Sequence, residues 1–83
     1  MNIAELLSER KKTHGDFSDH ARITQGLKSK MHWEDSWEKL TEIHKESLDM
    51  IVHKIGRILA GDPNHKDHWD DIAGYAKLVG DRL

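Results

Sequence analysis

The stretch that decides the fold runs from Asp49 to Leu78 and reads DMIVHKIGRILAGDPNHKDHWDDIAGYAKL. Apolar residues recur at helical spacing on both sides of the segment from Gly61 to Lys66, which contains the only proline of the chain, Pro63. A glycine readily ends a helix, and a proline cannot continue one. The stretch therefore predicts two helices joined by a short turn, which makes them antiparallel neighbours.

Four helices are expected along the chain from apolar spacing and capping residues. The expected ranges are Asn2–Lys12, Asp16–Met31 with Asp16 or Ser18 as the cap, Ser36–Gly61, and Asp67–Leu83. The sequence thus predicts an all-α fold within a single domain, residues 1–83. Residues 1–31 form the N-terminal helices, and residues 36–83 form a long central antiparallel helical hairpin.

Two apolar stripes are expected to supply the core when the helices are turned by 100° per residue. The stripe of the third helix contains Trp37, Leu40, His44, Leu48, Ile51, Ile55 and Ile58, and that of the fourth contains Trp69, Ile72, Ala76, Val79 and Leu83. His44 is therefore expected to be a core histidine. Gly74 and Gly80 are candidates for a close approach between helices.

Further apolar residues extend the third helix's apolar surface beyond half of its circumference. They are Ile43, Met50, Val52 and Leu59. A chain of 83 residues offers few other elements to cover such a helix. We therefore expect a homodimer.

Composition limits the classes of function. The formal net charge of −2 gives no electrostatic footprint for nucleic acid, and binding to DNA or RNA is not expected. No apolar run approaches the roughly 20 residues of a membrane span. The chain has no cysteine and no apolar leader, so we expect a cytoplasmic protein without disulfides or a membrane contact.

Acidic residues recur on the third helix at spacings that place them on one ridge. Glu42, Glu46, Asp49 and His53 follow one another by four, three and four residues. Carboxylates arranged in this way suit magnesium, especially when phosphate oxygens complete its shell. A solvated helix face shows the same pattern, and that alternative stays open.

Acidic residues also lie in the first turns of the fourth helix, where they can simply stabilise its N-terminus. Rotation places Asp67 and Asp71 at the border of the apolar stripe, which makes them the candidate metal ligands there. Lys54 and Arg57 lie toward the C-terminal end of the third helix, where positive charge is favourable. The functional alternative is that they contact phosphate.

Two segments resemble a group of small phage and prophage proteins of unknown activity. The segments are HGDF, residues 14–17, and the stretch from Met50 to Leu78, in which KIGRI and DxxGYAxL are the most specific elements. The resemblance extends from about Arg10 onward. It implies a phage origin and a helical fold.

A more distant likeness is to the MazG-type all-α nucleoside triphosphate pyrophosphohydrolases, with a Glu-Glu-x-x-Glu helix followed by a Glu-x-x-Asp helix. Glu42, Glu46 and Asp71 match three of the five motif acids, whereas Ile43 and His68 replace the other two. This likeness implies a magnesium-dependent nucleotide hydrolase in which Lys54 and Arg57 steady charge on the phosphate. The alternative is a non-catalytic phage protein that binds and inhibits a host defence factor.

Overall fold

The computed structural model describes residues 1–83 and contains four α-helices, one short 3₁₀ helix and no strand. The elements are α1 (Ile3–His14), α2 (Phe17–Trp33), the 3₁₀ helix η1 (Asp35–Lys39), α3 (Glu42–Ala60) and α4 (Lys66–Gly80). The all-α class that the sequence predicts is confirmed. No helix combines the length and apolar character needed to cross a bilayer.

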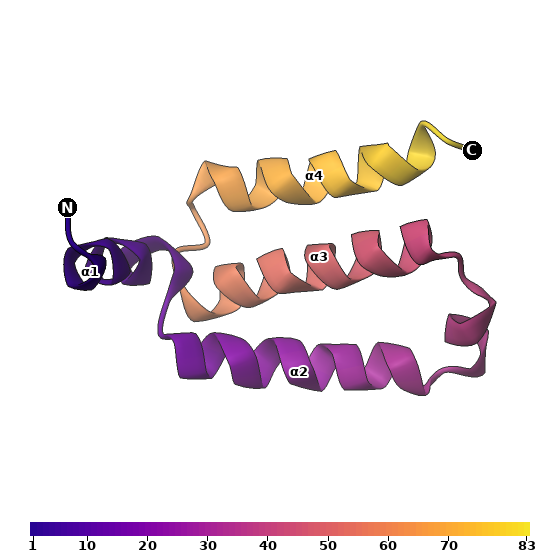
Figure 1. Ribbon diagram of the computed structural model, residues 1–83, viewed down its shortest axis with the longest axis horizontal. Helices are drawn as coiled ribbons and strands as arrows, with labels where there is room; N and C mark the ends of the chain where they lie inside the picture. Colours follow the sequence, from indigo (N-terminus) through magenta and orange to yellow (C-terminus); the bar gives the residue numbers. More distant parts are fainter.

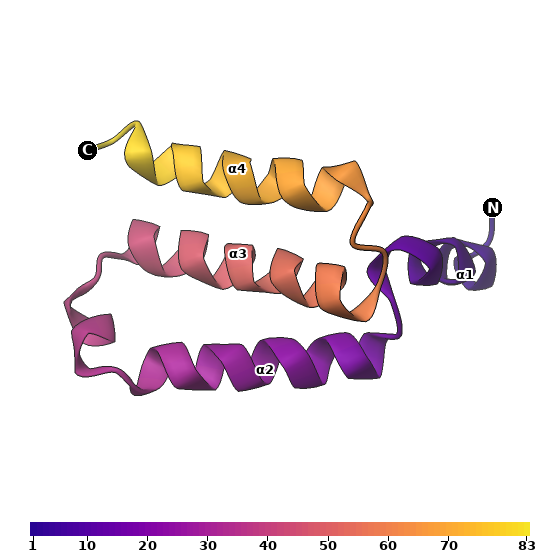
Figure 2. The same ribbon diagram turned by 180° about the vertical axis from the view of Figure 1, so that it is seen from behind.

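Helix α3 lies in the middle of the molecule, with α2 along one side and α4 along the other (Figures 1 and 2). The molecule measures 42 × 27 × 22 Å, and α1 projects from the end at which α3 turns into α4 (Figure 1). The two neighbours of α3 explain why its apolar residues extend around so much of its circumference. Val52, outside the predicted stripe, is one of only two buried apolar side chains.

The first two helices begin at predicted caps. The Asn2 side chain accepts a hydrogen bond from the Glu5 backbone N–H at 2.8 Å, and Asp16 accepts one from the Ser18 N–H at 2.9 Å. These carboxylate and amide oxygens bind backbone N–H groups that a helix leaves unpaired at its first turn. Helix α2 continues two residues beyond its expected end, to Trp33.

The start of α3 differs from the prediction, because the cap is Thr41 and not Ser36. Thr41 Oγ1 accepts from the His44 N–H, and His44 Nδ1 accepts from the Thr41 N–H, both at 3.3 Å. Leu40 is extended, with ψ of 150°, and separates η1 from α3. His44 therefore belongs to a reciprocal cap, with imidazole in the place usually taken by Glu or Gln, and not to the core.

Burial on α4 also differs from the prediction. Trp69, placed in the core stripe, is 54% exposed, and its indole N–H donates to the Pro63 carbonyl at 2.7 Å. The most buried side chain is His68, at 1% exposure, whose Nε2–H donates to the Thr13 carbonyl at 2.8 Å. The end of α1 covers this face of α4. The apolar pattern of α4 alone cannot predict this contact.

Close helix approaches occur at other glycines than Gly74 and Gly80, next to which an added Cβ would meet nothing within 4 Å. At Gly61 an added Cβ would lie 2.3 Å from the Thr13 carbonyl oxygen. Gly15 has a positive φ of 82° and lies just as close to the end of α3. The end of α1 therefore crosses the α3–α4 turn at backbone contact.

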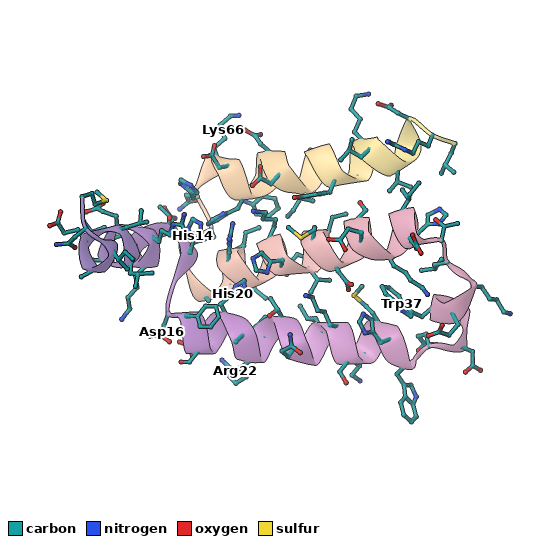
Figure 3. All side chains as sticks on the ribbon, in the orientation of Figure 1. His14, Asp16, His20, Arg22, Trp37 and Lys66 are labelled. Atoms are coloured by element: carbon teal, nitrogen blue, oxygen red, sulfur yellow. The ribbon has the colours of Figure 1, made fainter.

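The apolar core is small. Trp37 and Val52 are the buried apolar residues, whereas Leu48 of the predicted stripe is exposed and Ile51, Ile55 and Ile58 are half-buried. In Figure 3, Trp37 lies between the ends of α2 and α3. Much of the apolar surface that folding usually buries thus remains at the surface of one chain.

Candidate functional site

Two of the predicted metal ligands line a groove between α3 and α4. Glu42 and Glu46 lie one turn apart on α3 and face Tyr75 and Leu78 of α4 across a hollow of about 310 Å³. We call this hollow the acidic groove. The hydroxyl of Ser47 donates to the Tyr75 carbonyl at 2.6 Å, which holds α4 against α3 at this level. Both carboxylates are exposed to solvent.

The third motif acid, Asp71, is already paired. Its carboxylate accepts from the Lys54 ammonium at 3.0 Å, and this hydrogen bond together with the charge of Lys54 lowers the pKa of Asp71. Lys54 is only 7% exposed. A buried ammonium needs such a partner, so Asp71 compensates the charge of Lys54 across the α3–α4 contact. Asp71 lines a separate, open hollow that shares Tyr75 and Leu78 with the acidic groove.

The remaining predicted ligands point elsewhere. Asp49 accepts from His32 Nε2 of α2 at 3.1 Å, and the His32 ring packs against Trp37 with ring centres 4.4 Å apart. Asp67 is exposed, 3.8 Å from His65 Nε2. Asp49 therefore faces α2 and not the acidic groove, and Asp67 lies in the first turn of α4, where the N-cap position is occupied by His65 and not, as predicted, by Asp67.

The fit to magnesium is incomplete within one chain. No three carboxylate or imidazole side chains gather closely enough to hold a cation. Glu42 and Glu46 supply two carboxylates, and Asp71 is engaged by Lys54. A magnesium ion here would need further oxygen ligands from phosphate or from another chain.

Arg57 lies far from the acidic groove. It is eleven residues beyond Glu46 on α3, which corresponds to about 16 Å along the helix axis. It lines a second cavity of about 450 Å³, together with His53 one turn before it and with Arg10 and His14 of α1. The two predicted basic residues are thus separated, since Lys54 binds Asp71 of α4 and Arg57 faces this cavity.

Histidines form two groups that the sequence did not reveal. The rings of His14 and His65 pack against His68, with centres 5.1 and 4.7 Å apart, where α1 crosses the α3–α4 turn. His20 Nε2 and His53 Nδ1 are 3.3 Å apart between α2 and α3. Seven histidines in 83 residues were the only signal, and their spacing along the chain matches no ligand motif.

The pKa of both His14 and His53 is lowered to about 4, first by burial and then by the positive charge of Arg57. Both rings are therefore neutral at pH 7. A neutral imidazole carries one N–H donor and one acceptor, so these rings can bind ligands by hydrogen bonds without adding charge.

The chain belongs to the family described as a domain of unknown function, DUF6378, whose model matches residues 2–83. No curated protein and no solved structure matches the chain. The family description states no activity, so the phage and MazG-type resemblances remain predictions from the sequence.

Proposed function

We propose that this DUF6378 domain is a cytoplasmic homodimer that binds a nucleotide between the α3–α4 hairpins of its two copies, each hairpin antiparallel as the sequence predicts. The observation that carries the proposal is the apolar border of the acidic groove. Ile43 and Leu78 are each about half exposed there, beside Glu42 and Glu46. Apolar side chains grouped at the edge of a polar hollow are typical of a surface that binds a partner.

The exposed area is consistent with a second copy. A compact monomer of this mass, 9.6 kDa, should expose roughly 5,100 Å² by the usual scaling with mass. The chain exposes 6138 Å², an excess of about 1,000 Å². A standard interface buries about 800 Å² on each partner. The excess is therefore the size that one interface would remove.

A second copy would also complete the set of oxygen ligands. In a two-fold dimer the same surface of each copy meets, so Glu42 and Glu46 of both copies would face one shared hollow. Magnesium prefers such carboxylates when phosphate oxygens supply the rest of its shell. Tyr75 offers an aromatic face for a nucleotide base. Because Asp71, the third motif acid, is bound to Lys54, we assign no hydrolytic step.

The dimer is tested by light scattering at low micromolar concentration, where we expect twice 9.6 kDa. Ile43→Glu should give a monomer of largely unchanged helix content, because Ile43 is about half exposed at the border of the groove and is not one of the buried core residues. Ile3→Glu is the matched control, since Ile3 is exposed on α1, away from the groove. A wild-type monomer would exclude this proposal.

Ligand binding is tested with magnesium and a nucleoside triphosphate in thermal melts. A ligand at about 100 times its Kd should stabilise the dimer by about 2.7 kcal/mol. Glu46→Gln should blunt the response to magnesium, whereas Glu38→Gln, on η1, should not. Release of pyrophosphate in the same samples would extend the proposal to the hydrolase that the MazG likeness implies. Equal melting temperatures with and without magnesium and nucleotide would contradict the proposed binding of a nucleotide.

A non-catalytic interaction protein is the second candidate function, and the same apolar border favours it. A different protein, such as the host defence factor suggested by the phage resemblance, could cover Ile43 and Leu78 in place of a second copy. A folded wild-type monomer that shows no response to magnesium or nucleotide would favour this alternative.

A further inference from the structure

A second cavity, of about 450 Å³, lies where α1, α2 and α3 meet. Its basic and histidine residues are Arg10, Lys11 and His14 of α1, His20 of α2, and His53 and Arg57 of α3. We call it the basic cavity. Figure 3 shows His14 at the end of α1 and His20 at the start of α2, both beside the C-terminal end of α3.

Helical spacing explains why these side chains share one cavity. His14 lies four residues after Arg10 and three after Lys11, so all three project from one face of α1. Arg57 lies four residues after His53, so these two share one face of α3. The turn at Gly15, which touches the end of α3, places the two faces against each other.

Two of the positive charges around the basic cavity, those of Arg10 and Arg57, have no carboxylate in contact with them. None of the residues that line it is acidic. Neither Arg10 nor Arg57 lies within 4.0 Å of a carboxylate oxygen, whereas Lys11 pairs with Asp16 at 3.6 Å. The pKa of Arg57 is lowered by burial, raised by Asp71 and lowered by Arg10, so the two guanidinium groups repel each other.

The histidines leave donors free for a ligand. His53 Nδ1 is occupied by His20 Nε2, so its other ring nitrogen, Nε2, has no partner in the protein. When His20 donates in this pair, His53 carries its proton on Nε2 and can donate it onward. His20 itself is 94% removed from solvent, and its Nδ1 faces Gly56 of α3 and not the cavity.

We propose that the basic cavity binds the phosphate group of a small molecule between Arg10 and Arg57. Each guanidinium can bind two phosphate oxygens through parallel N–H groups, and two such forks match a doubly charged group. A neutral His53 can donate one further hydrogen bond. The cavity is larger than a phosphate, so a diphosphate or a phosphorylated organic molecule also fits.

Ligand binding should also order α1. This helix has no buried residue, and its attachment is at its C-terminal end, where Thr13 O accepts from the Asp62 N–H at 2.9 Å and from His68. A phosphate held by both Arg10 and Arg57 would tie the middle of α1 to α3. Amide hydrogen exchange in residues 3–14 should therefore slow when the ligand is present.

The test is calorimetric titration with inorganic pyrophosphate in magnesium-free buffer containing a chelator. Arg10→Gln and Arg57→Gln should each weaken binding by about tenfold or more. Arg22→Gln is the matched control, because Arg22 is exposed on α2 and points away from α3 (Figure 3). Arg10 is exposed, so its replacement removes no buried packing, and the folded Arg10→Gln variant decides the outcome.

The result is separable from that of the proposed dimer, because every residue of the basic cavity comes from one chain. Pyrophosphate should bind equally well to Ile43→Glu, whether that variant is monomeric or not. A parallel titration with a nucleoside triphosphate shows whether the phosphate is preferred free or as part of a nucleotide. No binding to the wild type, or equal binding by Arg10→Gln and Arg22→Gln, would overturn the proposal.

Discussion

Replacing Gly56 by alanine tests the packing of α2 on α3. Gly56 is buried, and an added Cβ would lie 2.4 Å from Thr24 Cγ2 and 2.9 Å from His20 Nδ1. Carbon atoms normally approach to about 3.5–4.0 Å, so Thr24 must move by more than about 1 Å. Thr24 and His20 are themselves buried and cannot swing into solvent. Overpacking of this kind costs about 1–3 kcal/mol.

Alanine favours a helix over glycine by about 1 kcal/mol, which offsets part of the overpacking cost. Because both neighbours of the added Cβ are buried and closer than 3.0 Å, we place the overpacking cost in the upper part of its range, at about 2–3 kcal/mol. The net loss for Gly56→Ala is then about 1–2 kcal/mol, which is a fall of about 5–15 °C in Tm for a domain of this size. Gly26→Ala is the control: Gly26 is exposed on α2, with no neighbouring atom within 4 Å, and should gain about 1 kcal/mol. Thermal melts by circular dichroism compare the two. A Gly56→Ala variant that melts at or above the wild type would refute the close α2–α3 contact.

Three further changes test the burial and the charges. The pKa of His14 and of His53 lies near 4 in the folded chain and near 6.5 when unfolded, so the unfolded state takes up protons first as the pH falls. Each histidine should therefore lower the stability by up to about 2 kcal/mol between pH 7 and pH 5 in urea titrations, and His53→Gln should remove about half of the total drop. Asp71→Asn leaves the buried Lys54 unpaired and should lower Tm; a rise would indicate instead that Asp71 is repelled by other carboxylates. Trp37→Ala empties a buried site and should cost about 3–5 kcal/mol, measured by the same titration; a loss below 1 kcal/mol would contradict its place in the core.

Residue spacing predicted which site residues lie together on one helix, but not which residues meet between two helices. Glu42 and Glu46 lie together because four residues make one turn, and any helix would place them so. Asp71 was predicted to join them, but its carboxylate binds Lys54, a residue expected to contact phosphate. Spacing within each helix cannot show this pair, because it depends on how far α4 is shifted along α3.

The buried residues show the same limit. Hydrophobic periodicity predicted Trp69 in the core and gave no reason to bury His68. In the structure Trp69 is exposed and His68 is buried. Periodicity identifies the face of a helix that meets one apolar neighbour. Helix α3 meets two helices and α4 is crossed by the end of α1, so their buried faces depend on elements that lie elsewhere in the sequence.

The sequence by itself determined the all-α class, the cap Asn2 and the turn at Pro63, and it limited the cap of the second helix to Asp16 or Ser18, because these depend on hydrogen bonds and steric limits within a few residues. Only the tertiary structure decided which charges meet. Arg10 and Arg57 are 47 positions apart in the sequence, and they share a cavity because Gly15 allows the chain to turn against the end of α3. Contacts of this kind arise from the packing of whole helices, which no local pattern encodes.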